Sequence, residues 1–129
     1  MQPFLVTKVI DADTFEVSPG IPPRFALQTP MQRLRGKGLG ETAMEQLARP
    51  NTFKKVRLAN INAPESWTPQ GKQAVLYLKD LIEGKRVILQ PTDISDDQVV
   101  ADVWRYPNHF FINAAMVYRG HAQWTPGAL

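Results

Sequence analysis

Four polar side chains in two short stretches of the sequence have the chemistry needed to handle a metal ion and a phosphate. Asp13 ends a DAD motif, and Arg57, Asn62 and Glu65 lie within the stretch RLANINAPES. Carboxylate and amide oxygens are ligands for hard cations, and a guanidinium group pairs well with phosphate. The stretch therefore has two interpretations: a metal and phosphate site, or an ordinary strand that runs into a turn.

The composition limits which sites this chain can build. Its 129 residues, 43% of them hydrophobic, are enough for one globular domain over residues 1–129 with a real core. The absence of cysteine excludes disulfides and thiolate metal sites, which leaves oxygen donors and the histidines His109 and His121. Neither histidine has a second ligand at a typical spacing, so surface or structural roles are expected for both.

Charge and targeting features give weaker guidance. The net charge of +3 permits a polyanionic partner and fits a mildly basic surface equally well. The opening MQPFLVTKVI lacks the features of a secretory signal, and no apolar run approaches the ~20 residues of a membrane span. We expect a cytoplasmic protein without membrane contact, although a processed secreted domain would have the same features.

Two strands and an insertion are predicted before the stretch with the arginine. FLVTKVI at residues 4–10 and TFEVS from Thr14 are β-like and flank the DAD bend. Residues 19–54 are first rich in proline, then basic and rich in glycine, and then briefly helical in character. We interpret them as an insertion between the second and third strands.

The third strand, KKVRLANI, places the candidate residues on one side of a sheet. Val56 and Leu58 share one face, with Asn60 as the next candidate for it, and Arg57 points to the opposite face. If this strand pairs antiparallel with TFEVS, Asp13 and Arg57 lie at the same end of the pair. The insertion then lies at the other end, away from them.

The second half of the chain alternates helices and strands. A helix is predicted over Pro69–Glu83, with Thr68 as its N-cap and Gly84 as its C-terminal stop. KRVILQ and QVVADVW are predicted strands separated by the acidic turn TDISDD, and FINAAMVYRG is a short helix ending at Gly120. The order of elements predicts a mainly β, α+β fold: a small five-stranded barrel that carries helices.

Several of these segments, in this order, resemble the staphylococcal nuclease-like (thermonuclease) family. VIDADTFEV is similar to the family's V-x-D-G-D-T bend, and RLANINAPES to its R-L-x-x-I-D-x-P-E segment. GKQAVLYLKDLIEGKRVIL is similar to its G-x-x-A helix followed by G-K-x-V, while QVVADVW and INAAMVYRGHAQW match later motifs more loosely. The resemblance implies an OB-fold barrel and a Ca²⁺-dependent nuclease, a hydrolase that cuts phosphodiester bonds in DNA and RNA.

The resemblance also implies a role for each residue that matches a family motif. Asp13 would be a metal ligand, together with Asn62, which stands where the family has aspartate, and the backbone carbonyl of Ala63. Arg57 would bind the phosphate, and Glu65 would act on the attacking water. Arg57 and Glu65 thus match the family motif. Asn62 lacks the negative charge of the aspartate that the family has at this position.

A second departure falls on the strand QVVADVW. Gln98 stands where the family has a second catalytic arginine, and Asp96 and Asp97 replace the tyrosine and glycine before it. Arg105 is seven residues beyond Gln98, an odd number that reverses the face of a regular strand, so it is a poor substitute. With Asn62 and Gln98 at two catalytic positions, we expect weakened activity and weak or lost Ca²⁺ binding.

The alternative to a weakened nuclease is an inactive OB-fold module that binds single-stranded nucleic acid or a protein partner. The expected nucleic-acid contacts are Arg57, Trp67 and Lys72. Three basic residues of the insertion would add to such binding: Arg33, Arg35 and Lys37. A protein partner would use the insertion at 19–54 as its distinguishing surface.

Overall fold

The fold is known from a computed structural model that describes residues 3–22 and 52–126. Most of the expected insertion, residues 23–51, therefore lies outside the described residues, and so do Arg33, Arg35 and Lys37. The two ends of the insertion, residues 19–22 and 52–54, are described, and Ile21 pairs with Phe53 there.

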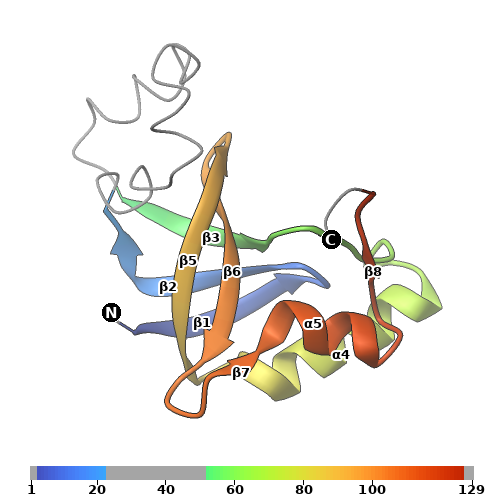
Figure 1. The fold of residues 1–129 in the computed structure, drawn as a ribbon. Coiled ribbons are helices and arrows are strands. Elements are labelled where there is room, and N and C mark those ends of the chain that lie inside the picture. The colour runs from blue at the N-terminus through green and yellow to red at the C-terminus, as the bar shows by residue number, and fades with distance from the viewer. Residues whose placement is uncertain (1–2, 23–51, 127–129) are drawn as a thin grey trace.

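Five strands close into a barrel (Figure 1). They are β1 (Phe4–Asp11), β2 (Thr14–Ile21), β3 (Phe53–Leu58), β5 (Arg86–Ser95) and β6 (Gln98–Arg105). Neighbouring strands are antiparallel, except that β3 pairs in parallel with β6 and so closes the barrel. This arrangement confirms the prediction of a five-stranded OB-type barrel with an insertion between its second and third strands.

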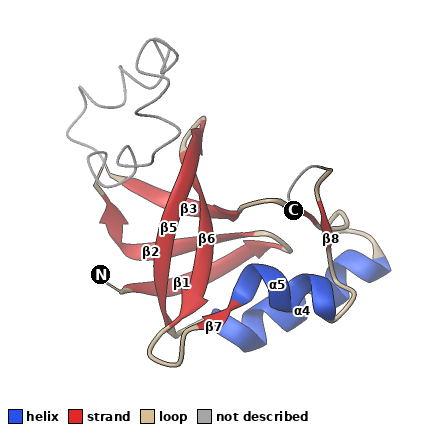
Figure 2. Cartoon of the chain, in the orientation of Figure 1, coloured by secondary structure: helices blue, strands red, loops and turns tan. Residues whose placement is uncertain are grey.

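Two helices lie together at one side of the barrel, as Figure 2 shows. They are α4 (Pro69–Ile82) and α5 (Ile112–Tyr118), and three short strands accompany them: β4 (Ile61–Asn62), β7 (Phe110–Phe111) and β8 (Gln123–Trp124). Thr68 caps α4 as predicted, since its side chain accepts a hydrogen bond from the Gly71 N–H. Neither described helix has the length and apolar character needed to cross a membrane.

Two local expectations were wrong. The strand β5 continues to Ser95, so the predicted six-residue turn shrinks to Asp96 and Asp97; pairing with β6 keeps the polar residues before them in the ladder. Asn60 does not extend the buried face of β3. It is exposed and has a φ of 65°, a left-handed conformation that asparagine tolerates in turns.

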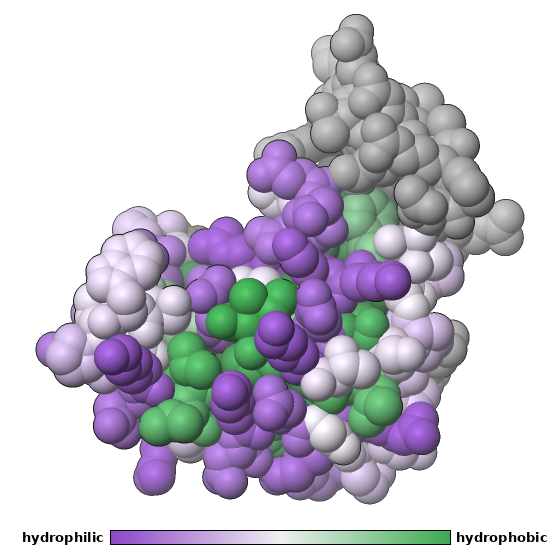
Figure 3. Space-filling view, turned by 180° about the vertical axis from the view of Figure 1, so that it is seen from behind, coloured by the Kyte–Doolittle hydropathy of each residue, from purple (hydrophilic) through white to green (hydrophobic). Residues whose placement is uncertain are grey.

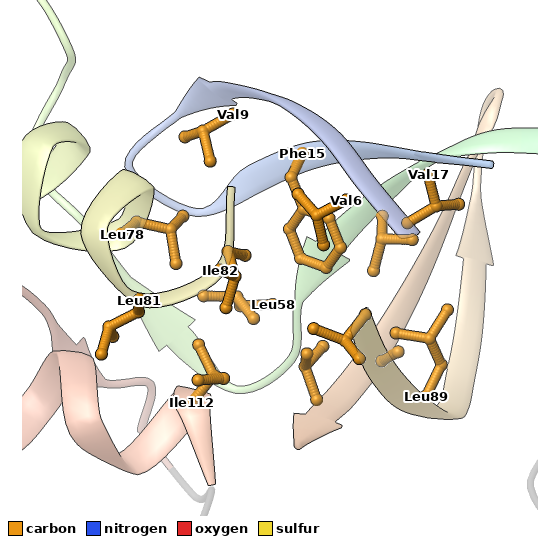
Figure 4. Close-up of a cluster of buried hydrophobic side chains, with 14 of the residues drawn as sticks. Val6, Val9, Phe15, Val17, Leu58, Leu78, Leu81, Ile82, Leu89 and Ile112 are labelled. Carbon is orange, nitrogen blue, oxygen red and sulfur yellow. The ribbon is translucent and has the colours of Figure 1, made fainter. Parts of the chain in front are cut away.

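The core joins the barrel to the helices. Phe15 of β2, Leu58 of β3, Ile82 of α4 and Ile112 of α5 are fully buried and lie around one interior space (Figure 4). On the face opposite to that of Figure 1, apolar residues of the described surface lie in small groups between hydrophilic ones (Figure 3). Scattered apolar residues of this kind are normal on protein surfaces, so this face gives no argument for a partner.

A buried asparagine connects the helices to the strands that carry the candidate site. Asn113 of α5 is fully buried; its Nδ2 donates to the carbonyls of Ala59 (3.0 Å) and Ala101 (3.3 Å). Its Oδ1 accepts from the N–H of Val103 at 2.9 Å. One side chain therefore fixes the segment that follows β3 against β6 and α5. The sequence offered no direct signal for this role beyond the asparagine of INAAMVYRG.

The variant Asn113→Ala is expected to lose about 3 kcal/mol of unfolding free energy, because it leaves buried backbone groups without partners. Urea unfolding followed by circular dichroism measures this loss. Gln73→Ala, which removes an exposed amide on α4, is the control and should change stability by less than about 0.5 kcal/mol. Equal losses in the two variants would show that the buried hydrogen bonds do not contribute as described.

Candidate active site

An open pocket of about 320 Å³ lies where the β1–β2 turn, the end of β3 and the loop after β4 meet. Figure 1 shows that the β1–β2 turn and the C-terminal end of β3 point to the same side of the barrel. The lining residues are Asp11, Ala12, Asp13, Arg57, Asn62, Ala63, Pro64, Glu65, Ser66 and Trp67. The structure thus brings together most of the residues singled out from the sequence.

Asp13 and Arg57 face each other across the pairing of β2 with β3. Thr14 lies opposite Arg57 in that pairing, and the Leu58 N–H donates to the Asp13 carbonyl at 2.8 Å. The Asp13 carboxylate accepts from the Thr14 hydroxyl at 3.0 Å and lies 3.6 Å from Arg57 Nε. Both side chains keep some exposure, 20% for Asp13 and 39% for Arg57, so a ligand in the pocket can reach them.

Glu65 is held by the cap of α4. Its carbonyl accepts from the N–H of Thr68 at 3.0 Å and from the hydroxyl of Thr68 at 2.7 Å. That hydroxyl in turn accepts from the Gly71 N–H at 2.9 Å. The first turn of the helix therefore fixes the backbone that presents the Glu65 carboxylate, which is itself exposed.

Asn62 lines the pocket from the end of β4, and Trp67 lines it from the loop that joins β4 to α4. Asn62 belongs to β4, which pairs with β8 through the partners Asn62 and Gln123. Trp67 lies at the rim and exposes 72% of its surface, as expected for a residue that could stack on a base. Ala63, whose backbone carbonyl is an expected cation ligand, lies between these two residues and also lines the pocket.

The close approach of α4 to this loop depends on a glycine. A Cβ at Gly71 would collide with the carbonyl oxygen of Glu65 and would lie 2.9 Å from the Cα of Ser66. Gly71→Ala must therefore displace the loop that carries Glu65. We expect a loss of about 1 to 3 kcal/mol in unfolding free energy.

Thermal unfolding of Gly71→Ala tests this expectation. Gln73→Ala, an exposed position two residues along the same helix, is the control, because it adds no contact and favours helix. A Gly71→Ala protein as stable as Gln73→Ala would show that the helix can shift without disturbing the loop.

Three residues considered from the sequence lie outside the pocket. Gln98 lies beside Lys55 in the parallel pairing of β3 with β6, while Val100 is the neighbour of Arg57. Gln98 thus lies two residues, or about 6.6 Å of strand, before the position beside Arg57. Lys72 is exposed on α4 and does not line the pocket, and Arg105 contacts the Leu81 carbonyl at 3.3 Å instead.

The histidines also lie away from this pocket. His109 is exposed in the turn before β7, with a φ of 58°. His121 is half-buried, and its ring packs on that of Tyr77 with 4.8 Å between centroids. Their placement fits the surface and structural roles expected from the sequence.

The lining of the pocket is acidic. Asp11, Asp13 and Glu65 oppose Arg57, which gives the described lining a formal charge of −2. The oxygen donors are of the hard type that Ca²⁺ binds, but within residues 3–22 and 52–126 no three Asp, Glu, His or Cys side chains gather closely enough for a metal centre. Burial raises the pKa of Asp102, a carboxyl on β6 outside this lining.

The comparison with known families agrees with this geometry. Residues 55–126, more than half of the chain, match the family of the staphylococcal nuclease homologues. The chain belongs to the staphylococcal nuclease family. No curated protein sequence matches it.

The part of this staphylococcal nuclease homologue that matches begins at β3, so the match contains Arg57, Asn62 and Glu65 but not Asp13. The structure adds the missing part of the family fold, because β1 and β2 complete the barrel and bring Asp13 to within 3.6 Å of Arg57. Asp11, which the sequence suggested only as a residue of the bend, also lines the pocket of this family member.

Proposed function

We propose that this chain hydrolyses phosphodiester bonds in single-stranded DNA or RNA, with Ca²⁺, at the pocket between the β1–β2 turn and the loop before α4. The observation that supports this most strongly is the meeting of Asp13, Arg57 and Glu65 around one open pocket. These residues come from three separate segments of a chain that belongs to the staphylococcal nuclease family.

The negative charge of the pocket indicates that a cation is needed, and it indicates which residues would bind that cation. A phosphate would be repelled by a lining of charge −2, so a divalent cation must offset the carboxylates before a phosphodiester can bind. Asp13, Asn62 and the Ala63 carbonyl are the oxygens that would hold that cation. Lewis-acid polarisation of the phosphate is the chemistry that Ca²⁺ supplies when bound.

Arg57 and Glu65 act on the substrate in this proposal. The guanidinium of Arg57 has several N–H donors, so it can bind a phosphate oxygen while Nε remains near Asp13. Its charge stabilises the negative charge that develops on the phosphoryl group. The exposed carboxylate of Glu65 takes a proton from the attacking water.

The activity is weakened at two positions that the structure separates. Asn62 lies in the pocket and supplies an oxygen without a charge, which lowers cation affinity. Gln98 lies outside the lining, and Arg57 is the only basic residue among the described residues of the lining. The family's arginine at position 98 would bring a second cation to this end of β6, and no described lining residue other than Arg57 supplies one.

Incubation of the purified chain with single-stranded DNA, with increasing Ca²⁺ or with a chelator, tests the proposal. We expect slow cleavage that requires Ca²⁺ and stops on chelation. DNA that stays intact over a wide range of Ca²⁺ concentrations would contradict the proposed hydrolysis.

The exposed Trp67 at the rim of the pocket, together with Arg57, favours a second candidate function, binding of single-stranded nucleic acid without cleavage. Fluorescence anisotropy with a labelled oligonucleotide distinguishes the two. Binding that weakens as salt rises, with no product formed, would support the second candidate.

A further inference from the structure

A second pocket lies directly beside the candidate active site. It has a volume of about 410 Å³, within the usual range for small-molecule sites. Its described lining residues are Asn62, Ala63, Pro64, Thr68, Gln70, Gly120, His121, Ala122 and Gln123. Because Asn62, Ala63 and Pro64 line both pockets, this short segment separates them, and a chain-like ligand could occupy both at once.

The two pockets differ in chemistry. The candidate active site contains three carboxylates and a guanidinium, whereas the described lining of the second pocket contains no Asp, Glu, Lys or Arg. Apolar groups of Ala63, Pro64 and Ala122 form part of its surface, and three amide side chains join them: Asn62, Gln70 and Gln123. Such a surface suits an uncharged planar group with hydrogen-bonding edges rather than a phosphate.

Residues 120–123 of the lining are held in place by contacts outside the pocket. The His121 ring packs on Tyr77, and the Arg119 guanidinium lies over the same tyrosine at 5.5 Å from its centroid. The His121 N–H donates to the Met116 carbonyl at 2.9 Å, and the pairing of β8 with β4 fixes Gln123 opposite Asn62. The pocket is thus formed before any ligand arrives, which reduces the cost of ordering on binding.

We propose that this neutral pocket binds the base and sugar of the nucleotide next to the phosphodiester held in the candidate active site. The inference rests on the proposed function, in which the ligand is a nucleic-acid strand. Such a strand can place a charged phosphate in one pocket and an uncharged base in the pocket beside it. The apolar groups contact the face of the base, and the amides of Gln70 and Gln123 bond to its edges.

Amide chemical shifts measured by NMR test this proposal separately from the proposed function. The full chain carrying Glu65→Gln, to suppress cleavage, is titrated with the single-stranded tetramer d(TTTT) and with a sugar-phosphate tetramer that lacks bases, both in Ca²⁺. We expect residues 57–65 to respond to both ligands and residues 120–123 to respond to d(TTTT) alone. Responses confined to 57–65 with both ligands would overturn the base subsite and leave the proposed function intact. No response anywhere would overturn both.

Two glutamine variants provide a second, charge-matched test. Gln123→Glu places a carboxylate in the second pocket, while Gln73→Glu makes the same charge change at an exposed position of α4 outside both linings. We expect Gln123→Glu to weaken binding of d(TTTT) about tenfold relative to Gln73→Glu. For the tetramer without bases, we expect the affinities of Gln123→Glu and Gln73→Glu to differ only by the small effect of where the added charge lies. Equal affinity of the two variants for d(TTTT) would contradict the proposal.

Discussion

Replacement of Arg57 by alanine is expected to lower the rate of single-stranded DNA cleavage by about 100- to 1,000-fold, the usual effect of removing one preorganised donor from a reacting charge. The effect should lie at the upper end, because Arg57 is the only basic residue among the described residues of the lining. The variant also leaves the Asp13 carboxylate without its neighbouring charge at 3.6 Å. Single-turnover cleavage at saturating Ca²⁺ measures the change.

Two further arginine variants control this measurement. Arg57→Lys keeps the charge but loses the planar donor geometry, so it should recover part of the rate. Arg86→Ala removes an exposed arginine at the start of β5, outside the lining, and should cleave within about twofold of the unchanged chain. If Arg57→Ala and Arg86→Ala cleave at the same rate, the phosphate does not bind where we place it.

Asn62→Asp is expected to raise Ca²⁺ affinity by about 10- to 100-fold. The substitution adds a carboxylate to the pocket that also contains Asp13, and Ca²⁺ affinity depends strongly on the number of charged ligands. Even in a partly solvated site, a unit charge at ligand distance contributes on the order of a few kcal/mol before desolvation. Isothermal titration calorimetry with Ca²⁺ measures the affinity.

Asn108→Asp is the control for this gain, since it makes the same chemical change in the exposed turn before β7. That variant should leave Ca²⁺ affinity unchanged within about twofold. An Asn62→Asp chain that binds Ca²⁺ no better than Asn108→Asp would show that Asn62 is not a cation ligand.

The sequence was sufficient to predict the barrel and the meeting of Asp13 with Arg57. Alternating apolar residues on β2 and β3, and the bend before Thr14, place the two side chains at one end of an antiparallel pair. The start of α4 was equally readable, because Thr68 and Pro69 have strong local preferences at a helix N-terminus. The start of α4 depends on neighbours in the sequence, and β2 and β3 are consecutive strands whose facing ends are marked by the bend and by Arg57.

Features that depend on contacts between non-consecutive elements could not be predicted from local sequence patterns. The position of Gln98 relative to Arg57 follows from the register of β3 with β6, two parallel strands that are not consecutive along the chain. The second pocket depends on the pairing of β4 with β8, each of which has two residues and no recognisable pattern. The three hydrogen bonds of Asn113 likewise join three segments that only the fold brings together.

The central claim, that this pocket hydrolyses phosphodiester bonds, is tested most directly by comparing single-turnover cleavage by the unchanged chain and by Glu65→Gln. Both proteins are purified in parallel and assayed on one labelled single-stranded DNA at saturating Ca²⁺. We predict Ca²⁺-dependent cleavage by the unchanged chain, and cleavage at least about 100-fold slower by Glu65→Gln with DNA binding retained. Equal cleavage by the two proteins, or none by either, would contradict the assignment of this site.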